Sequence, residues 1–237
     1  MPSRAETPVL QPLSSSSMEL VFGADSQMYP SPLPLSVLAS WVKACPNFAF
    51  QYRHPGDPGK VVGICITLPV LKPHWDDLVS GRIHEWDIAP SMLWRGGGGG
   101  ECAKKAGVDD DVGLHIWHIE RLSGWQRAWG AFGKYVWDDV SRGLLDQPKG
   151  PNVMCYSALA VTEDGMRLFR DRLGWKESPC YQGQWVVSSG VGENRVAQIV
   201  EKKDWLAGVG VEAVVAAGLE VIGDCRMLVG MREEQCG

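Results

Sequence analysis

Several features that mark other protein classes are missing from this sequence of 237 residues. It contains no run of about 18 apolar residues, so we expect no membrane-spanning helix. Residues 1–17 are rich in Ser and Pro and lack the apolar stretch of a secretory signal. We therefore expect a disordered lead-in over 1–17 and a cytoplasmic protein, with the nucleus as the alternative location.

An excess of basic residues is also missing. The chain has 23 Lys and Arg against 28 Asp and Glu, and its formal net charge is −5. A nucleic-acid-binding domain usually has a basic patch or a clear excess of positive charge. We expect no nucleic-acid partner, and mild acidity of this size mainly indicates solubility.

Paired cysteine motifs are absent as well. The 7 cysteines are widely spaced and include no C-x-x-C pair. This argues against a zinc ribbon or a thioredoxin-like motif, and we expect no metal site. Cys65 and Cys155 lie in apolar segments, which predicts buried thiols in a protein from a reducing compartment.

What the sequence does contain is the pattern of a mixed α/β domain over residues 18–190. Alternating or unbroken apolar segments predict strands at 18–22, 48–53, 61–68, 112–122, 153–161 and 181–187. Helical spacing of apolar residues predicts helices at 34–45, 73–80, 132–144 and 163–173. Hairpins at the start and strand–helix–strand crossovers at the end predict a central, mostly antiparallel sheet flanked by helices.

Two segments lie outside this regular pattern. Residues 72–111 form an insertion with five consecutive glycines at 96–100. These glycines predict a flexible surface loop, because each has a large backbone entropy to lose. Residues 191–237 form a C-terminal extension, in which Val196–Val200 shows helical spacing and Met227–Met231 predicts a last strand.

Residues 153–175 combine a buried strand, a polar turn and a short helix. The segment Val153–Val161 is almost entirely apolar, as in a strand that is covered on both faces. Met166, Phe169 and Leu173 then fall at i, i+3 and i+7 and form one apolar stripe. From patterning alone, any strand–helix pair of an α/β protein remains the alternative.

The end of this helix resembles a known family. Residues 168–175 read Leu-Phe-Arg-Asp-Arg-Leu-Gly-Trp. In the GCN5-related N-acetyltransferases (GNATs), the helix that closes the acyl-coenzyme A site typically ends in Leu-Tyr-x-x-Leu-Gly-Phe. The order of elements over 18–187 is also similar. The resemblance implies the GNAT-like acyl-coenzyme A N-acyltransferase fold, with 72–111 inserted between the third and fourth strands.

The same resemblance implies a binding site for acetyl-coenzyme A between the fourth and fifth strands. In the family these strands part, and coenzyme A uses the free backbone groups between them, which places Ile119 and Arg121 at the cofactor. The closing helix brings Phe169 to the same site. The cofactor's pyrophosphate rests on amides at the N-terminus of the helix after strand four, where the helix dipole favours anions.

The matching phosphate loop is the sequence Arg-Ala-Trp-Gly-Ala-Phe at 127–132. The family pattern is Q/R-x-x-G-x-G/A, so Arg127 and Gly130 fit, and Phe132 stands where a small residue is expected. Gly133 takes that role if the loop shifts by one residue. The alternative is a glycine-bearing turn before an ordinary helix.

His118 matches the strand-four histidine that takes the amine proton in some amine acetyltransferases of this family. A free imidazole titrates near pH 6.5, which suits proton transfer at neutral pH. Glu120 can hold the imidazole or act as the base itself. The alternative is a structural histidine whose hydrogen bonds are satisfied.

Strict alternation along strand four predicts that Ile116, His118 and Glu120 share one face of the sheet. It predicts that His115, with Trp117 and Ile119, faces the other way. This argues against a metal site built from the two histidines.

The position that often holds a thiolate-protonating tyrosine in the family is Phe169 here, which has no hydroxyl. Tyr156 on the fifth strand is the possible substitute. Without either group the thiolate leaves unprotonated, since a thiol pKa near 8.5 makes it a tolerable leaving group.

Acceptor recognition is expected from the first helix, the hairpin tip and residues 72–94. In that last segment His84, Glu85 and Asp87 lie among aromatic residues. Carboxylates beside aromatic rings can hold a cationic amine. The alternative is a cover for the sheet with a solvated face.

These residues predict an enzyme. The expected activity is transfer of acetyl from acetyl-coenzyme A to an amine of a small molecule or a protein, by direct attack in a ternary complex. A catalytically weak or inactive acyl-coenzyme A-binding module is the alternative, which Phe169 and the imperfect loop favour. A structural α/β protein is the third possibility. The sequence indicates neither the acceptor nor the oligomeric state.

Overall fold

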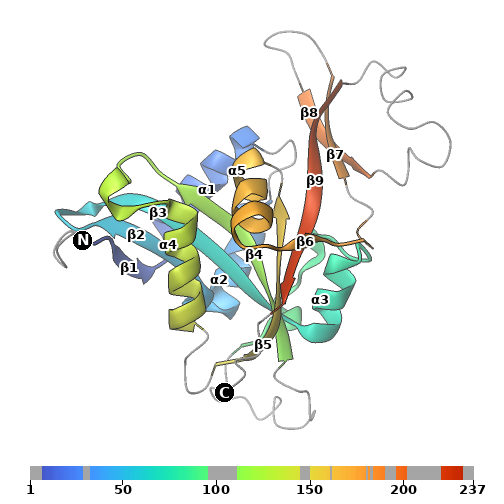
Figure 1. The fold of residues 1–237 in the computed structure, drawn as a ribbon, viewed down its shortest axis with the longest axis horizontal. Coiled ribbons are helices and arrows are strands. Elements are labelled where there is room, and N and C mark those ends of the chain that lie inside the picture. The colour runs from blue at the N-terminus through green and yellow to red at the C-terminus, as the bar shows by residue number, and fades with distance from the viewer. Residues whose placement is uncertain are drawn as a thin grey trace.

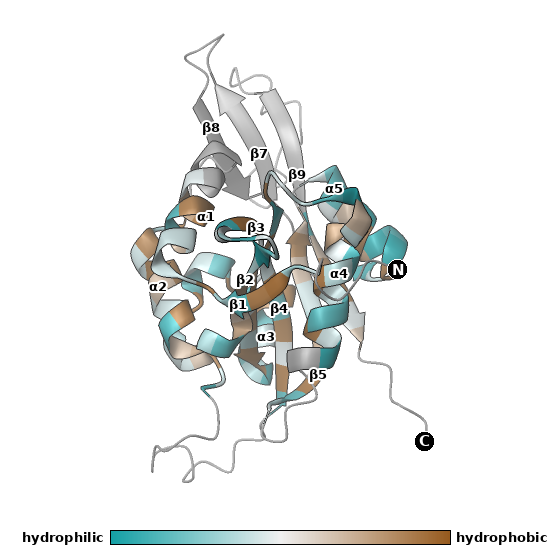
Figure 2. Cartoon of the chain, turned by 90° about the vertical axis from the view of Figure 1, so that its left-hand side faces the viewer, coloured by the Kyte–Doolittle hydropathy of each residue, from teal (hydrophilic) through white to brown (hydrophobic). Residues whose placement is uncertain are grey.

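A central sheet lies between two groups of helices in the computed structural model of the chain (Figures 1 and 2). The structure describes residues 7–28, 33–95, 111–144, 150–160, 162–179, 181, 184–189, 196–201 and 220–231. In Figure 2 the helices α1 and α2 lie on one side of the sheet, and α4 and α5 lie on the other. The prediction of a mixed α/β sheet flanked by helices is confirmed.

Within the described residues, the sheet has 9 strands in the order β1-β2-β3-β4-β5-β9-β7-β8, and β6 pairs with β9 as well. Their bounds are β1 Val9–Pro12, β2 Ala49–His54, β3 Asp57–Leu71, β4 Asp111–Arg121, β5 Asn152–Ala160, β6 Lys176–Glu177, β7 Gln184–Ser189, β8 Val196–Glu201 and β9 Glu220–Met231. Among these pairings only β4 with β5 is parallel. In Figure 1, β7, β8 and the first half of β9 extend above the rest of the sheet.

The helices divide into two groups. One face of the sheet, which we call the α2 face, is covered by α1 Ser15–Met28, α2 Leu35–Ala44 and α3 Lys72–Val79, with the short 3₁₀ turns η2 Pro46–Phe48, η3 Glu85–Asp87 and η4 Pro90–Met92. The opposite face, the α4 face, is covered by α4 Phe132–Asp139 and α5 Glu163–Met166, which continue as the π-helical turns η7 Val140–Leu144 and η8 Arg167–Arg172. The 3₁₀ turn η6 Arg127–Trp129 precedes α4.

Local chemistry explains where α5 begins and ends. The hydroxyl of Thr162 accepts a hydrogen bond from the backbone N–H of Gly165 at 3.1 Å and so caps the helix. Gly174 has φ of 70°, a left-handed conformation that glycine adopts without strain. The N–H of Trp175 then bonds to the carbonyl of Phe169 at 2.9 Å, so the chain folds back onto the last turn as the sequence predicts.

A β-bulge interrupts β4 at Trp117. On β3, Ile66 and Leu68 are two residues apart and share a face, yet their partners on β4 are His118 and His115, three residues apart. The extra residue on β4 shifts the alternation of its side chains by one. His115 and His118 therefore lie on the same side, the α2 face.

The prediction of strict alternation along β4 is wrong for this reason. Ile116 is opposite Thr67 of β3 and lies on the α4 face, away from His118 and Glu120. His115 shares the α2 face with His118 instead of opposing it. A sequence pattern does not show where one strand gains a residue over its partner.

Three predicted elements near the ends of the chain also differ from the structure. Residues 9–12 pair with β2 and residues 15–28 form α1, so 7–17 are not a disordered lead-in and 18–22 are not a strand. Ser14, Ser17 and Gln51 hydrogen-bond to one another, which holds α1 against the sheet. Residues 196–201 form the strand β8 and not a helix.

The other predicted elements are confirmed with small changes of boundary, including the last strand over 227–231. The glycine run at 96–100 lies outside the described residues. Among the described helices, none is long and apolar enough to cross a bilayer.

Gly63 provides a test of how α4 packs on the sheet. A Cβ added to Gly63 would lie 2.3 Å from the ring of Phe132, which itself packs against Tyr52. We expect Gly63→Ala to lower the free energy of unfolding by about 1–3 kcal/mol, measured by chemical denaturation, because the ring must move. Gly23→Ala is the matched control: a Cβ there meets nothing within 4 Å, and the variant should be as stable as the wild type or slightly more stable.

Candidate functional site

Strands β4 and β5 part in the middle of the sheet. Their parallel pairing runs from Asp111 with Asn152 to Ile116 with Ala158 and stops there. Beyond this point β4 continues to Arg121 and stays paired with β3, while β5 stays paired with β9. A wedge-shaped opening in the backbone hydrogen bonding therefore begins directly after Ile116.

Backbone groups of β4 face this opening. The N–H of Leu122 bonds to the carbonyl of Val62 on β3 at 3.1 Å. In an antiparallel pair alternate residues direct both backbone groups to the same neighbour. Glu120 therefore points its backbone groups toward β3, and those of Ile119 and Arg121 point toward the opening. These are the two strand residues that the sequence analysis selected.

The loop after β4 leads to the N-terminus of α4. Gly130 has φ of 84°, a region that other residues rarely adopt, and a Cβ there would meet nothing within 4 Å. The indole N–H of Trp125 donates to the carbonyl of Gly130 at 2.9 Å and holds the loop. Ala131 precedes the helix and has no side chain that can cap it. The first amides of α4 are therefore left to external acceptors.

Gly133 and Arg127 have different surroundings. Gly133 lies within α4, where an added Cβ would be 2.7 Å from the side chain of Leu168. Its lack of a side chain thus lets α4 approach η8 closely. Arg127 is exposed in η6, and Arg121 is exposed at the end of β4. The structure gives Gly133 a packing role, and its contact with a phosphate stays a prediction.

A stack of aromatic rings on the α4 face lies between α4, η8 and β5. Phe169 stacks on Trp175 with ring centroids 4.8 Å apart, and Trp175 stacks on Tyr156 at 5.9 Å. Trp137 of α4 meets both Tyr156 and Trp175 edge-on. Tyr156 and Phe169 are therefore brought into one cluster, and both are buried.

His118 and Glu120 form a pair on the opposite, α2 face. His118 Nε2 lies 3.3 Å from Glu120 Oε2. The histidine is only 6% exposed, whereas Glu120 is partly exposed. The ring of His118 also contacts that of Trp117 at 5.5 Å, and Trp117 in turn meets Trp41 of α2. The pair lies on the part of β4 that has no β5 partner.

Comparisons with known proteins bear on the fold. No protein-family model matches the sequence, and no curated protein matches it. The loading GNATL domain of CurA from Lyngbya majuscula superposes with a TM-score of 0.51 at 10% identity, covering 94% of this chain and 97% of that one. The chain has the GNAT fold. Arabidopsis thaliana NAA60 in complex with acetyl-CoA gives a TM-score of 0.49 at 10% identity, covering 95% of this chain and 100% of that one.

The NatC complex bound to Gag peptide and CoA also matches, with a TM-score of 0.49 at 10% identity over 95% of this chain and 99% of that one. At 10% identity, the match to the GNATL domain establishes the fold alone. The sequence-predicted residues then fall into three places on this fold. Ile119, Arg121, Arg127 and Gly130 lie along the opening and its loop, His118 and Glu120 lie on the α2 face, and Tyr156 and Phe169 lie on the α4 face.

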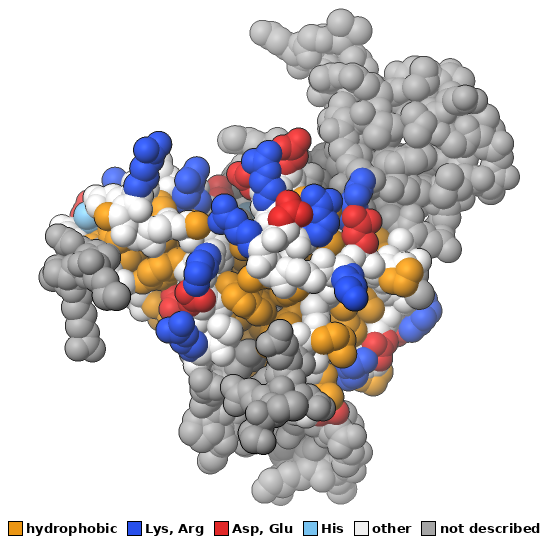
Figure 3. All heavy atoms as spheres, in the orientation of Figure 1, with side chains coloured by type: hydrophobic (Ala, Val, Ile, Leu, Met, Phe, Trp, Pro, Cys, Tyr) orange, Lys and Arg blue, Asp and Glu red, His pale blue; other side chains and the backbone are white. Residues whose placement is uncertain are grey.

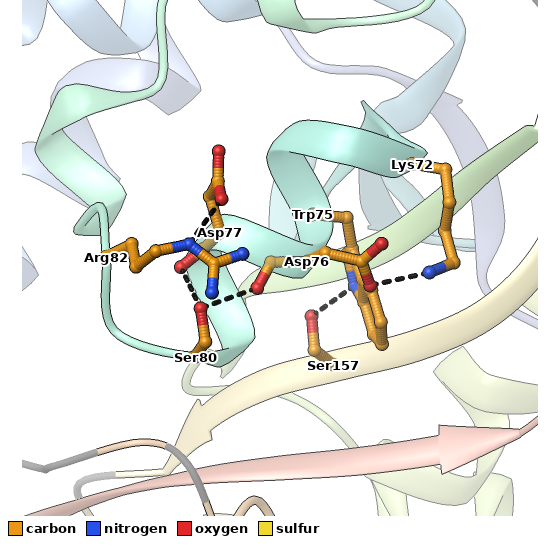
Figure 4. Close-up of polar contacts among 7 residues, drawn as sticks. All are labelled: Lys72, Trp75, Asp76, Asp77, Ser80, Arg82 and Ser157. Carbon is orange, nitrogen blue, oxygen red and sulfur yellow. Dashed lines mark hydrogen bonds and ion pairs between the residues drawn. The ribbon is translucent and has the colours of Figure 1, made fainter.

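A second polar network was not predicted from the sequence. His115 Nδ1 lies 2.9 Å from Ser157 Oγ, and His115 Nε2 lies 2.7 Å from Glu85 Oε1. The indole N–H of Trp75 donates to Ser157 Oγ at 2.8 Å (Figure 4). His115 and Ser157 are fully buried. They are also direct partners across β4 and β5, one rung before the strands part.

The order Ser, His, Glu resembles that of a hydrolytic triad, but the surroundings of Ser157 exclude it as a nucleophile in this conformation. Trp75 packs over Gly113, where an added Cβ would be 2.1 Å from the indole, and so covers Ser157. The sequence signal that could have revealed this network is the presence of one polar residue in each of two apolar strands, His115 in β4 and Ser157 in β5. Glu85 could not be linked to them because its loop is distant in the sequence.

The predicted amine-holding cluster at 84–87 is used internally. Glu85 is bonded to His115, and Asp87 accepts a hydrogen bond from the backbone N–H of His84 at 2.9 Å. Trp86 is the exposed member and stacks on the ring of His84 at 4.7 Å. One oxygen of each carboxylate is thus already engaged by the protein, and the binding of an amine by Glu85 and Asp87 stays a prediction.

Cys45, Cys65 and Cys155 are not activated nucleophiles. Cys45, Cys65 and Cys155 are free and buried. Burial raises the pKa of Cys45 and of Cys155 to about 12, and it raises the pKa of Cys65 well above the ordinary value. In the part of the chain that the structure describes, no three His, Cys, Asp or Glu side chains come together as metal ligands.

Asp139, at the end of α4, is a partly buried carboxylate on the α4 face. Burial raises its pKa above the ordinary value, and the nearby hydroxyl of Tyr52 acts in the opposite direction. A carboxyl group whose pKa rises on folding favours the folded state at low pH. That contribution is lost as the pH rises through the raised pKa.

We therefore expect Asp139→Asn to stabilise the protein at pH 7, because the variant no longer carries a charge in this position. The gain over the wild type should shrink as the pH falls through the raised pKa of Asp139, and it should be gone below about 4. Denaturation midpoints across this pH range measure the difference. Asp171→Asn is the control of opposite sign, since the exposed Asp171 has its pKa lowered by its hydrogen bond with Arg170.

Proposed function

We propose that this protein is an N-acyltransferase that moves an acetyl group from acetyl-coenzyme A to an amine by direct attack in a ternary complex. The observation that supports the proposal most is the parting of β4 and β5 after Ile116, with the backbone groups of Ile119 and Arg121 directed into the opening. An extended amide-containing chain can bond to such free strand groups as a missing strand would. The pantetheine arm of coenzyme A has that character.

The residues around the opening fit the rest of coenzyme A. The uncapped N-terminus of α4 and the open space at Gly130 suit a pyrophosphate, and Arg121 and Arg127 add positive charge nearby. The buried indole N–H of Trp129 has no acceptor among the described residues, so the loop retains an unused donor. Figure 3, in the orientation of Figure 1, looks onto the α4 face and shows hydrophobic side chains near its centre, with Lys and Arg side chains around them.

When bound, acetyl-coenzyme A would supply an activated acyl group as a thioester. The task of the protein is to remove a proton from the attacking amine. His118 lies beside the opening on the α2 face, and Glu120 can hold its imidazole in position for that step. Burial of His118 beside Trp117 keeps water from competing for the reaction.

The departing thiolate either gains a proton from a side chain or leaves as an anion. Phe169 occupies the position next to Trp175 and has no hydroxyl to donate. Tyr156 lies on the same face and packs on the same tryptophan, so it is the proposed acid. Otherwise the thiolate leaves unassisted, which its ordinary pKa allows.

The alternative function is an acyl-coenzyme A-binding module that does not turn over. Two observations favour it: Phe169 lacks a hydroxyl, and His118 is 6% exposed in this conformation. Both functions require coenzyme A to bind in the same opening, so a measurement of coenzyme A binding alone does not distinguish them.

Two measurements on the full chain test the proposal. Titration of coenzyme A should quench or shift tryptophan fluorescence, because Trp125 and Trp129 are in contact beside the loop at 5.1 Å. Thiol release from acetyl-coenzyme A should then be measured with three acceptors: a peptide with a free N-terminus, Nα-acetyl-lysine amide and spermidine. Binding without thiol release favours the module. Absence of binding contradicts both functions.

Gly130→Asp should weaken coenzyme A binding about tenfold or more, because it adds a negative charge where the phosphates are proposed to lie. Gly130→Asn has nearly the same size and the same backbone strain without the charge. A fluorescence titration of both variants separates the two effects. Equal affinities for the Asp and Asn variants would count against the phosphate assignment.

His118→Ala should lower kcat about 100-fold and remove the acidic limb of the kcat/KM profile against pH, since the general base is lost. Coenzyme A affinity should stay within about twofold, because the side chain lies on the α2 face. His74→Ala, on α3, is the control and should leave both parameters unchanged. Retention of the acidic limb in His118→Ala would exclude His118 as the base.

A further inference from the structure

The segment 82–94 covers the α2 face and is fixed to the sheet at several points. The carbonyl of Ile88 accepts a hydrogen bond from the indole N–H of Trp41 at 2.7 Å. The N–H of Trp94 bonds to the carbonyl of Pro69 at 2.8 Å. Between α3 and these contacts, the segment is held by the hydrogen bond between His115 Nε2 and the carboxylate of Glu85.

The donors and acceptors in this network define its direction. The indole N–H of Trp75 can only donate, so Ser157 Oγ accepts from it (Figure 4). The ionised carboxylate of Glu85 can only accept, so a neutral His115 carries its proton on Nε2. His115 Nδ1 is then an acceptor for the hydroxyl proton of Ser157. The chain runs from Trp75 through Ser157 and His115 to Glu85, and each member is satisfied.

Segment 82–94 is connected to β4 before the bulge, through His115, and at the bulge, through Trp41 and Trp117. His115 lies before Trp117, and the ring of His118 lies after it. Segment 82–94 contacts His115 through Glu85, and it reaches Trp117 through Trp41, whose ring centroid is 5.6 Å from that of Trp117. The segment is thus positioned against the strand that carries the proposed base.

We propose that Glu85 and His115 form a latch that holds segment 82–94 in place as one wall of the acceptor site, and that the latch controls acceptor binding. The proposal rests on the proposed function, in which the amine approaches His118 from the α2 face. Coenzyme A is bound along the opening and at the N-terminus of α4. The latch therefore affects the KM for the amine and leaves that for acetyl-coenzyme A unchanged. Glu85 and His115 act as positioning residues.

The first test needs no activity. In the imidazole ¹H–¹⁵N spectrum of the full chain, His115 should show a neutral ring protonated on Nε2, with slow exchange of that proton. A neutral ring protonated on Nδ1 alone would overturn the latch, because Nε2 could then not donate to Glu85. Glu85→Ala should abolish the slow exchange and increase hydrogen–deuterium exchange of backbone amides in 82–94. Glu85→Gln should preserve both properties, because its amide oxygen still accepts from Nε2.

The second test uses whichever of the three amine probes releases thiol. Glu85→Ala should raise the KM for that amine about tenfold, as expected for loss of a hydrogen bond from a partly buried charged group. The KM for acetyl-coenzyme A should change less than about twofold. Glu163→Ala, which removes an exposed carboxylate from α5, is the control and should change neither.

The outcomes separate the two proposals. If no probe releases thiol, the proposed function fails, and the spectra and exchange rates still decide whether the latch exists. Unchanged exchange in 82–94 for Glu85→Ala overturns the latch. An equal rise in both KM values overturns its role at the acceptor. If Glu85→Ala does not fold, the wild-type spectrum and Glu85→Gln still test the tautomer and the hydrogen bond.

Discussion

Strand β4 has two neighbours that follow different paths, and the bulge at Trp117 lies where those paths separate. Toward β3 the ladder continues for the full length of the strand, whereas toward β5 it ends at Ile116. Unpaired backbone groups are costly when buried, so a persistent opening of this kind is stable only with a partner for those groups. The bulge also decides which side chains accompany the opening, because it brings His115 and His118 to one face.

Close contact between the layers depends on glycine at a few positions. Aromatic or leucine side chains from the covering elements lie where a Cβ would otherwise be, at Gly63, Gly113, Gly133 and Gly230. Each contact presses a bulky group of a helix or loop onto a strand or a second helix. Trp175, the ring over Gly230, also belongs to the stack with Phe169 and Tyr156. The same packing that stabilises the fold thereby sets the surroundings of the proposed acid.

Much of the fold could be predicted from the sequence, because apolar period and turn chemistry are local properties. The strand at 152–160, the cap at Thr162 and the glycine end at Gly174 follow from adjacent residues. The bulge could not be predicted, since it depends on the register between two strands. The hydrogen bond between His115 Nε2 and the Glu85 carboxylate joins residues 30 positions apart and required the tertiary structure. Residues 9–28 were mispredicted because the apolar residues there show little helical or strand periodicity.

The parallel arrangement of β4 and β5 has a topological consequence. Two strands that run the same way cannot be joined by a tight turn, so the chain must travel back along the sheet between them. Here that return path is α4. The N-terminus of α4, which is the positive end of the helix dipole, must lie near the end of β4, where the pairing with β5 has already stopped. Lengthening the ten-residue connector 122–131 would shift this pole relative to the gap while leaving every strand pair intact, so its length fixes the spacing of the two features.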